Sequence, residues 1–347
     1  MAGRYEVDQV TLAELLGDEP AYRARQVWEG LYGHWNRPAE MTNISQALRD
    51  RLERELPSQL HAAHEQVSEG GDTVKWLWAL DDGARIETVL MLYPDRATVC
   101  VSTQAGCAMG CGFCATGQAG FERHLGVGEI VEQVADAARR AAPRRVSNVV
   151  FMGMGEPLAN FDATWGAVER LHDDAGISAR RLTISTVGVV PGIERLADQR
   201  LPVGLAVSLH AADDCLRDEL VPLNRRYPLA RLEEACARYR DRTGRRLSFE
   251  WALIDATNDR DADADRLAVI ARRLGAHVNL IPLNPTPGFA TRGSPPERVR
   301  AFRDRLRSLH VNVTVRRNRG TDIDAACGQL RAEKTVLLGE PQRTASV

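Results

Sequence analysis

Short apolar segments and amphipathic segments alternate along the chain from residue 97 to residue 283. Apolar runs rich in β-branched residues predict buried strands, and apolar residues spaced three and four positions apart predict helices. The expected strands are 97–101, 146–152, 182–186, 203–209, 247–254 and 277–283, and the expected helices between them are 127–140, 162–175, 191–198, 229–242 and 263–274. Such alternation is typical of parallel strands joined by crossover helices. It predicts an α/β fold, a partial (β/α)6 barrel with its active site at the carboxyl ends of the strands.

The residues before this barrel have a different pattern. Thr11, followed by Glu14 three positions later, is a capping-box pattern and predicts that a helix starts at Thr11. Strands are expected at 74–80 and 85–92, joined by the turn 81–83 as a hairpin. The expected divisions of the chain are a small N-terminal helical accessory domain (1–60), a β-hairpin extension (61–96), the barrel core (97–330) and a C-terminal tail (331–347).

Three cysteines, Cys107, Cys111 and Cys114, lie at the spacing C-x3-C-x2-C in a glycine-rich loop after the first barrel strand. Thiolates are the ligands that hold Fe–S clusters, zinc or Cu(I). A four-iron cluster held by three cysteines keeps one iron without a protein ligand, and a substrate can bind there. The alternative is a zinc knuckle with its fourth ligand elsewhere. Structural zinc sites more often have two separated pairs of ligands, and the sequence contains no second pair.

Polar and glycine residues follow several of the expected strands. Two glycines and a glutamate occur in the segment 153–157, and Asn284 follows the last of these strands. Glycines let a ligand approach the backbone closely, and a glutamate can accept hydrogen bonds from an ammonium group. Because the carboxyl ends of parallel strands meet at one side of a barrel, these residues predict a ligand site opposite the cysteine loop. The candidate ligand-binding residues are Gly155, Glu156, Ser185, Ser208, Leu209, His210 and Asn284.

Other chemically notable residues lie outside the cysteine loop. Cys327 lies beside a glycine in a polar segment, and from the sequence alone it is a fourth cluster ligand, a structural thiol or a nucleophile. Cys100 lies on the strand that leads into the cysteine loop. Glu87 interrupts an apolar strand; it is expected on an exposed face by default and is otherwise a candidate base. Cys215 and Cys236 are expected to be small core residues.

The composition limits the class of protein. The net charge of −2 excludes a uniformly basic nucleic-acid binder, although the arginine-rich stretch 292–319 predicts a local phosphate-facing patch. No apolar run is long enough to span a membrane, and no signal peptide is expected at the N-terminus. Seven cysteines, an odd number with three in one loop, favour a reducing cytoplasm over a secreted disulfide scaffold.

Five segments together resemble one known family, the dual-specificity ribosomal and transfer RNA adenine methyltransferases of the radical S-adenosylmethionine (SAM) superfamily. The three-cysteine spacing is the hallmark of that superfamily. Thr321 departs from the expected acidic or small residue, and the chain beyond Leu330 has no counterpart in the pattern. The matching segments are 85–89, 100–107, 153–160, 208–211 and 322–330.

The resemblance implies a radical SAM barrel and two kinds of cofactor. A [4Fe–4S] cluster would be held by Cys107, Cys111 and Cys114, and SAM would lie across the carboxyl ends of the strands, two molecules being used for each methylation. Carbon 2 of adenine is electron-poor, so it cannot attack the SAM methyl group directly. By resemblance Cys327 is methylated first and carries the carbon to the adenine, Cys100 resolves the resulting adduct through a Cys100–Cys327 disulfide, and Glu87 accepts the proton.

The implied partners are 23S ribosomal RNA, transfer RNA and an electron donor such as flavodoxin or ferredoxin, and a cytoplasmic monomer with no membrane association is expected. The accessory domain (1–60) is expected to bind RNA. One alternative is the related antibiotic-resistance methyltransferase, which modifies carbon 8 of the same ribosomal adenine. The segment 217–224 and the context of Asp322 favour the carbon-2 enzyme. Another alternative is a non-catalytic RNA-binding module with a structural metal.

Overall fold

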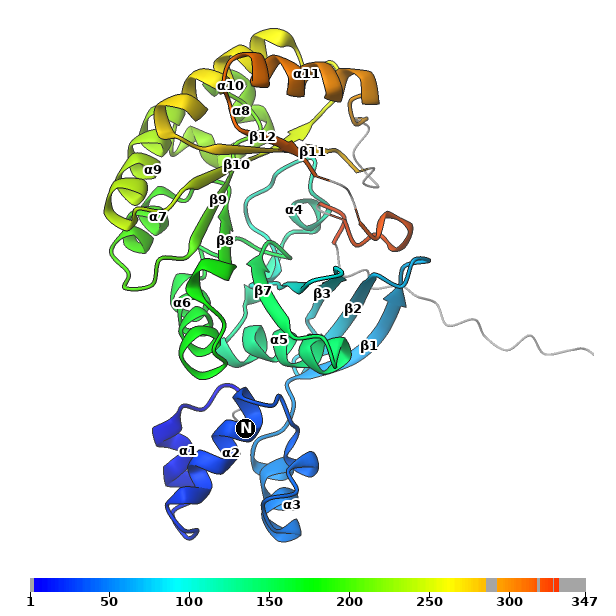
Figure 1. Ribbon diagram of the computed structural model, residues 1–347, viewed down its shortest axis with the longest axis vertical. Coiled ribbons are helices and arrows are strands. Elements are labelled where there is room, and N and C mark those ends of the chain that lie inside the picture. Colours follow the sequence, from blue (N-terminus) through cyan, green and yellow to red (C-terminus); the bar gives the residue numbers. More distant parts are fainter. Residues whose placement is uncertain (1–2, 285–291, 317–318, 327, 331–347) are drawn as a thin grey trace, which may run out of the picture.

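The computed structural model describes residues 3–284, 292–316, 319–326 and 328–330. Within these residues ten strands form one curved sheet, and a row of helices covers its outer side (Figure 1). The strands follow one another across this sheet in the order β1-β2-β3-β4-β7-β8-β9-β10-β11-β12, and β5 pairs with β6 in a separate ribbon. No helix of the described residues is both long enough and apolar enough to cross a membrane.

The sheet has an antiparallel part and a parallel part. Pairing is antiparallel from β1 to β4 and parallel from β4 to β12, so β4 joins the two parts. The strands are β1 (Leu60–Val67), β2 (Thr73–Leu80), β3 (Arg85–Leu92), β4 (Ala97–Cys100), β5 (Gln104–Gly106), β6 (Phe121–His124), β7 (Val146–Phe151), β8 (Leu182–Thr186), β9 (Gly204–Ser208), β10 (Leu247–Leu253), β11 (His277–Pro282) and β12 (Val313–Val315). The hairpin of β2 and β3 is confirmed, and β1 adds a strand that the sequence did not predict.

Helices connect the parallel strands, and in the described part of the chain six successive strand–helix units run from β4 to α11. The predicted partial (β/α)6 barrel is therefore confirmed; β12 follows it as a further parallel strand. The α-helices are α1 (Gln9–Leu15), α2 (Tyr22–Tyr32), α3 (Gln46–Glu55), α4 (Ala115–Ala119), α5 (Val127–Ala141), α6 (Phe161–Glu169), α7 (Val190–Ala197), α8 (Asp214–Leu220), α9 (Leu229–Thr243), α10 (Asp261–Leu274) and α11 (Pro296–Ser308). Shorter helical turns lie at Pro38–Glu40, Arg170–Asp174, Ala179–Arg181, Pro222–Arg225 and Thr321–Ile323.

Two sequence predictions about local structure are wrong. Helix α1 begins after Asp8, whose side chain accepts a hydrogen bond from the backbone N–H of Thr11 at 2.7 Å, so Thr11 lies inside the helix and is not its cap. Cys215, expected in the core, is exposed on α8, whereas Cys236 is buried as predicted.

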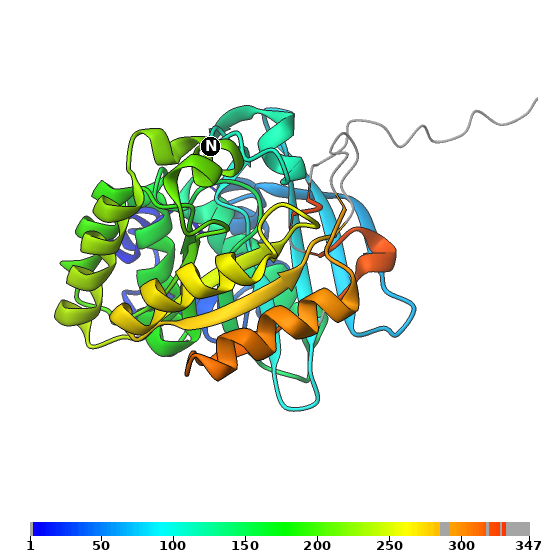
Figure 2. The ribbon, with the colours of Figure 1, turned by 90° about the horizontal axis from the view of Figure 1, so that it is seen from above.

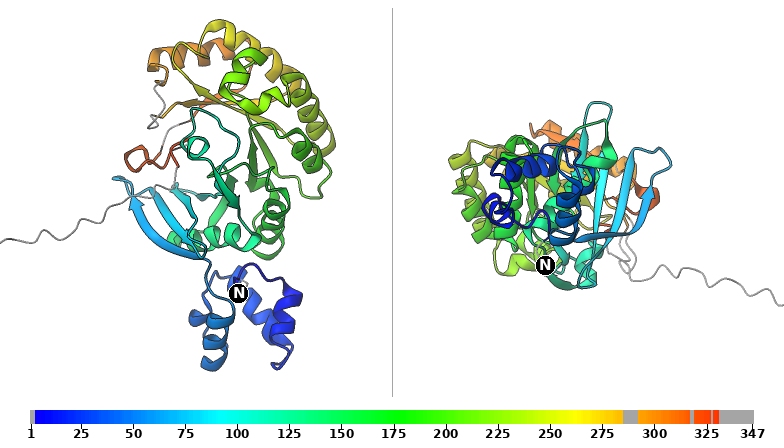
Figure 3. Two further views of the ribbon diagram at one scale, coloured as in Figure 1. Left: turned by 180° about the vertical axis from the view of Figure 1, so that it is seen from behind. Right: turned by 90° about the horizontal axis from the view of Figure 1, so that it is seen from below.

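The N-terminal helices lie at one end of the sheet (Figure 3, left). Tyr5, Tyr32 and Trp35 form an aromatic cluster within this group of helices, with ring centroids 5.5 to 6.3 Å apart. The indole N–H of Trp28 donates to Asp174 at 3.0 Å, at the end of the helical segment that continues α6. The group therefore has apolar contacts of its own and also a polar contact with the barrel.

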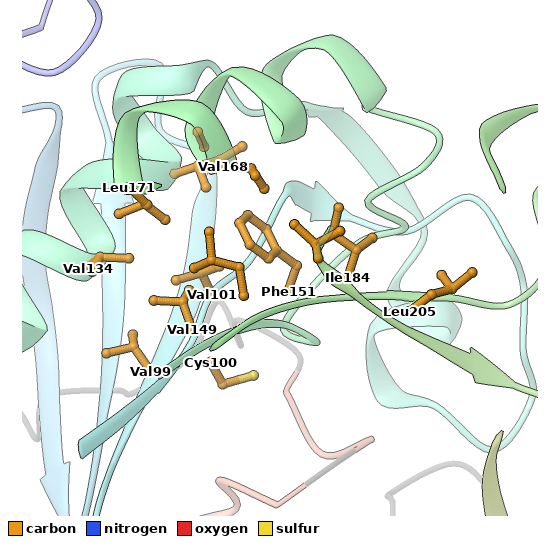
Figure 4. Packing of buried hydrophobic residues seen from close by; sticks show 14 of the residues in the cluster. Val99, Cys100, Val101, Val134, Val149, Phe151, Val168, Leu171, Ile184 and Leu205 are labelled. Atoms are coloured by element: carbon orange, nitrogen blue, oxygen red, sulfur yellow. The ribbon is translucent and has the colours of Figure 1, made fainter. Parts of the chain in front are cut away.

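The main core lies between the sheet and its outer helices. Val99 and Val101 pack with Phe151 toward α5 and α6, whereas the sulfur of Cys100 points to the opposite face of the strand (Figure 4). Alternate side chains of a strand point to opposite faces, so this orientation follows from the position of Cys100 between two core valines. Figure 2 shows the outer helices α10 and α11 side by side, in yellow and orange. The inner side of the sheet carries α4 and the described residues 319–326 and 328–330 (Figure 1).

Candidate active site

A short β-ribbon holds the cysteine loop. Strand β5 delivers Cys107, whose N–H donates to the carbonyl of Gly120 at 2.7 Å, immediately before β6. Gly106 has φ +75°, and a Cβ atom there would lie 2.0 Å from the carbonyl oxygen of Gly120. Only glycine therefore allows the two ends of the loop to approach so closely. Helix α4 begins directly after Cys114.

Cys107, Cys111 and Cys114 line one cavity of about 150 Å³ on the inner side of the barrel. Burial raises the pKa of the Cys107 thiol to about 12 and raises that of the Cys111 thiol further, and the neighbouring thiols act in the same direction. Because cluster and metal ligands are thiolates, these buried sulfurs require a positively charged group beside them to ionise. A cluster of iron ions has the charge and the soft-ligand preference that this set of thiols requires.

The cysteine loop could hold either a four-iron cluster or a single zinc ion, and the two differ in how the thiols have to be arranged. A single zinc ion needs several ligands that converge on one point. The residues that the structure describes contain no group of three or more His, Cys, Asp or Glu side chains that could hold a metal ion in this way. In a four-iron cluster each cysteine binds a different iron, and three thiols that line one cavity are the protein ligands that such a cluster takes.

Glu156 lines the same cavity and is buried. Its two carboxylate oxygens accept hydrogen bonds from the backbone N–H groups of Leu158 (3.0 Å) and Val187 (2.9 Å). Burial raises its pKa to about 7 despite these hydrogen bonds. Gly155 has φ +99°, and a Cβ atom there would lie 2.6 Å from the side chain of Gln104, so glycine is required for the turn. A ligand ammonium group would offset the cost of burying the carboxylate charge.

The ends of β8 and β9 contribute the other polar wall. Ser185, Ser208 and His210 line the same cavity. Nδ1 of His210 accepts a hydrogen bond from the N–H of Ala252 at 3.0 Å, which leaves the ring proton on Nε2. Burial, and secondarily the charge of Arg217, lowers the pKa of His210 to about 3, so the ring is neutral at physiological pH.

Two of the predicted ligand-binding residues lie behind this wall. Leu209 is buried in the core, and Asn284 is buried just after β11; neither lines the cavity. Gly155, Glu156, Ser185, Ser208 and His210 line it together with the three cysteines. The structure thus brings together eight of the residues that the sequence predicted for cluster and ligand binding.

A second cavity, of about 80 Å³, adjoins the first. Cys100 lines it, with Ala325 and Ala326 on the facing segment. Both cavities are lined in part by the same three residues, Met152, Ile281 and Arg316. A thiol that the sequence placed before the cysteine loop therefore lies in a cavity that neighbours the cluster-binding cavity.

Glu87 is buried, so the default expectation of an exposed face is wrong. The reason lies in the fold: segment 320–326 covers that face of β2 and β3, where a Cβ on Gly320 would lie 2.9 Å from the side chain of Thr73. One Glu87 carboxylate oxygen lies 3.5 Å from Nζ of Lys75. Glu87 lines neither of the two cavities described above, but its strand supplies Val89 to the second.

Described residues of the C-terminal segment line both cavities. The carbonyl of Gly328 accepts a hydrogen bond from the N–H of Ala115 on α4 at 2.8 Å, and Gly328 lines the first cavity. Ala326 lines the second. Cys327 itself lies outside the described residues.

Comparisons with known proteins identify the family. Residues 101–268 match the model of the radical SAM superfamily. The chain is 51% identical to the "Probable dual-specificity RNA methyltransferase RlmN" of Chloroflexus aurantiacus over 96% of this chain and 94% of the relative, and 53% identical to the protein of the same name from a Parafrankia strain over 91% and 88%. A crystal structure of a radical SAM methyltransferase from Sphaerobacter thermophilus superposes with a TM-score of 0.92 at 50% identity and covers 96% of this chain and 100% of that one. The chain belongs to the RlmN family.

Membership in the RlmN family confirms the predicted resemblance and the radical SAM fold class. The radical SAM superfamily uses SAM and a [4Fe–4S] cluster, so the two predicted classes of cofactor are supported as well. The cavity lined by Cys107, Cys111 and Cys114 has the donor set that such a cluster needs, and the carboxyl group of Glu156 lines the same cavity. The division of the chain into domains remains a prediction.

Sequence reasoning missed a structural residue of this RlmN-family site. Arg217, fully buried at the start of the segment 217–224, donates hydrogen bonds to the carbonyls of Val187 (2.6 Å) and Leu209 (3.1 Å) and to the side chain of Asn224 (2.8 Å). Burial lowers its pKa to about 10, so it is still a cation at neutral pH. Arg217 thus ties together the chain after β8 and the chain after β9. In the sequence Arg217 is flanked by the acidic residues Asp214, Asp218 and Glu219, a pattern that is typical of an exposed helix and does not show that the guanidinium is buried against carbonyls.

Proposed function

We propose that this chain methylates carbon 2 of an adenine in 23S ribosomal RNA and of an adenine in transfer RNA. The methyl carbon passes through an S-methyl group on Cys327, and each methylation uses two SAM molecules. The named relatives are dual-specificity RNA methyltransferases, which supports RNA as the substrate. The proposed catalytic residues are Glu87, Cys100 and Cys327.

One observation carries this proposal: two adjoining cavities have different chemistry, and residues on either side of position 327 line one each. The first contains the three cluster cysteines and Glu156, and the second contains Cys100. Ala326 lines the second and Gly328 the first. The methyl carrier has to react first with SAM and then with the adenine and the resolving thiol. Neighbours of the carrier that line both cavities support a carrier able to reach both groups of reactants.

The side chains of the first cavity supply binding and orientation. The Glu156 carboxylate accepts the ammonium group of SAM, the hydroxyls of Ser185 and Ser208 bind its polar groups, and neutral His210 presents an N–H donor. Cys107, Cys111 and Cys114 hold the cluster. When bound, the cluster and SAM supply the radical chemistry that removes a hydrogen atom from a methyl group and takes up one electron.

The chain's own residues carry the carbon. The thiolate of Cys327 takes a methyl group from one SAM by displacement. After one hydrogen atom is removed from this S-methyl group, its carbon bonds to carbon 2 of the adenine; Glu87 takes the proton of carbon 2, and one electron leaves the adduct. Cys100 then attacks the sulfur of Cys327, which forms a disulfide and releases the methyl carbon to be protonated as 2-methyladenine. A two-electron reductant restores the two thiols.

We propose that residues 1–60 form an accessory domain that binds RNA. Residues 61–96 would extend the 97–330 core as a β segment, and residues 331–347 would form a tail. A low-potential donor of the flavodoxin or ferredoxin type is expected to reduce the cluster. We keep a cytoplasmic monomer as the expected state.

Mass spectrometry of RNA tests the function. RNA from a strain that lacks the gene is incubated with reconstituted enzyme, SAM and a reductant, and its nucleosides are compared with 2-methyladenosine and 8-methyladenosine standards. We expect 2-methyladenosine in both 23S ribosomal RNA and transfer RNA, and none with a Cys111→Ala control. Formation of 8-methyladenosine would instead assign the chain to the antibiotic-resistance chemistry. If neither methylated adenosine forms, the remaining alternative is a non-catalytic, metal-containing RNA-binding module.

A further inference from the structure

Lys75 is unusual in this chain. Of the 45 lysine and arginine residues only two, Lys75 and Lys334, are lysines. Arginine therefore occupies 43 of these 45 positions, and Lys75 is one of the two exceptions. Lysine has a compact ammonium with three donors, whereas arginine has a wide planar fork, so the two are not interchangeable in a confined space.

The strand register places Lys75 in one row with a catalytic thiol. Lys75 on β2 is the direct partner of Val89 on β3, and Val89 is the direct partner of Cys100 on β4. Directly opposed residues project from the same face of a sheet, and so do residues two apart on one strand, so Glu87 shares this face. This is the face on which Val89 and Cys100 line the second cavity.

The Lys75 ammonium contacts two groups from different parts of the chain. Nζ lies 3.5 Å from the Glu87 carboxylate and donates to the carbonyl of Asp324 at 3.3 Å. The side chains of Lys75 and Glu87 are only 9% and 7% exposed. Asp324 has φ +50°, in the left-handed region that is uncommon for residues other than glycine, although aspartate adopts it more readily than most. Asp324 also lies three residues before Cys327.

We infer that Lys75 is a positioning residue for methyl transfer, which fixes the Glu87 carboxylate and the Cys327-bearing segment on the face of the sheet that presents Cys100. The inference rests on the proposed function. Lys75 touches neither SAM nor the adenine, and it acts through two partners: it keeps the proton acceptor oriented, and it ties the methyl carrier's segment to β2. Two further contacts hold the same segment, Glu69 N–H to Asp322 at 2.8 Å and Arg319 to Asp72 at 2.5 Å, but neither involves a proposed catalytic residue.

The coupling between SAM consumption and RNA methylation tests the inference. We compare Lys75→Met, Glu87→Gln and the double variant with wild type, in anaerobically reconstituted protein. Lys75 lines neither cavity, so Lys75→Met should keep the wild-type iron content and SAM affinity. The ratio of 2-methyladenosine formed to 5′-deoxyadenosine formed should fall by about tenfold or more, because removing one partner of a buried charge pair leaves the other poorly placed. This ratio does not depend on how much of the enzyme is folded.

Hydrogen exchange supplies a readout that needs no turnover. Peptides that contain residues 320–326 should exchange faster in Lys75→Met than in wild type, because the tie to the Asp324 carbonyl is lost. The double variant removes both buried charges, so it should fold even if Lys75→Met does not, and its coupling ratio should be no worse than that of Glu87→Gln. The matched control is Arg139→Met, which removes a partly buried cation from the Asp136 ion pair on α5, away from both cavities.

The outcomes separate the possibilities. Wild-type coupling and exchange in Lys75→Met would overturn the inference and leave Lys75 as a packing residue. Additive losses in the double variant would also overturn it, because they would mean that Lys75 does not act through Glu87. A loss of coupling in Arg139→Met as large as in Lys75→Met would do the same. Absence of 2-methyladenosine from the wild-type reaction would instead refute the proposed function. The hydrogen-exchange comparison would still show whether Lys75 holds the segment 320–326 through the Asp324 carbonyl.

Discussion

Glu156 combines a ligand-facing position with a carboxyl group in an unfavourable environment. The backbone N–H groups of Leu158 and Val187 donate to its oxygens, yet burial still raises its pKa to about 7. The folded protein therefore holds a proton on Glu156 over a pH range in which the unfolded chain, with a carboxyl pKa of 4.5, has released it. A proton bound more tightly by the folded state stabilises that state, and this stabilisation is lost as the pH rises through about 7.

Glu156→Gln tests this in protein without cofactors. The amide cannot ionise, so the variant should gain stability relative to wild type as the pH rises from about 5 to about 8, by on the order of 3 kcal/mol. Urea unfolding of both proteins at the two pH values measures the change. Glu194→Gln, on the exposed α7–α9 surface, is the control and should show no pH-dependent difference. A Glu156→Gln difference that stays constant with pH would contradict the burial argument.

Replacement of Cys100 and replacement of Cys327 should stop the methylation reaction at different steps. Cys327→Ala removes the methyl carrier, so neither methylated protein nor methylated RNA should form, while the iron content should remain that of a full cluster. Cys100→Ala removes only the resolving thiol, so the enzyme should methylate Cys327, bond to the RNA and stop. Denaturing gels of protein purified from cells, with and without nuclease, detect the covalent adduct. Normal turnover without an adduct in Cys100→Ala would remove Cys100 from the mechanism, and loss of iron in Cys327→Ala would make it a cluster ligand.

At the scale of elements, the loops after β8 and β9 form one structural unit although they are distant in sequence from each other. Arg217 on α8 joins them through the carbonyls of Val187 and Leu209, and Asn224 orients Arg217 while its own amide donates to Asp214 (2.9 Å). Ser208 and Val187 both line the first cavity. The position of these cavity-lining groups therefore depends on a cation that does not itself line the cavity.

Arg217→Gln should weaken this unit. Each buried carbonyl left without a donor costs about 1–3 kcal/mol, so loss of two such bonds should lower the free energy of unfolding by roughly 2–6 kcal/mol and weaken SAM binding. Thermal unfolding and SAM titration measure the two effects. The control is Arg238→Gln, which breaks an exposed ion pair with Glu194 at 3.5 Å and should change stability by about 0.5 kcal/mol or less. Unchanged SAM affinity in Arg217→Gln would restrict Arg217 to a stability role.

The sequence predicted those elements whose pattern is local. Apolar periodicity located the barrel strands and most of the connecting helices, and cysteine spacing located one wall of the first cavity. It did not predict β1, whose outward residues are mostly exposed and polar, or α4, which has only five residues. The sequence also did not predict the burial of Glu87 or the contacts of Lys75, because both depend on a segment more than 200 residues away in the chain. The contacts of Arg217 depend on which carbonyls the neighbouring loops present, and no local pattern encodes that.

At the scale of the whole molecule, helices cover the outer side of the sheet (Figure 1). The two cavities are lined by residues of the barrel strands, the cysteine loop and the C-terminal segment. Some arginines of the stretch 292–319 lie on the outer layer of helices, and others line a cavity. On α11, Arg298 and Arg305 are paired with Asp261 and Asp265 on α10, on the outer layer. The predicted phosphate-facing patch is therefore narrower than the sequence suggested, and its candidates are the arginines that reach the cavities.

Arg316 and Arg319 are those candidates. Both line the second cavity, and the Arg319 guanidinium lies 4.3 Å from the centroid of the Tyr93 ring, which lines the same cavity. A cation and an aromatic ring that line the same cavity suit a phosphate and a flanking base. Replacing both arginines by glutamine should weaken RNA binding and reduce the slope of log K against log salt by about 0.7–0.9 for each lost phosphate contact. Arg316 and Arg319 also have ion-pair partners, Glu250 and Asp72, so what distinguishes them from the control pair is their position at the cavity. The control pair, Arg298→Gln with Arg305→Gln, should leave affinity and slope unchanged, because those side chains lie on the outer layer and line neither cavity. Filter binding of transfer RNA over a range of salt concentrations makes the comparison, and equal slopes for the two double variants would assign the phosphate contacts to another surface.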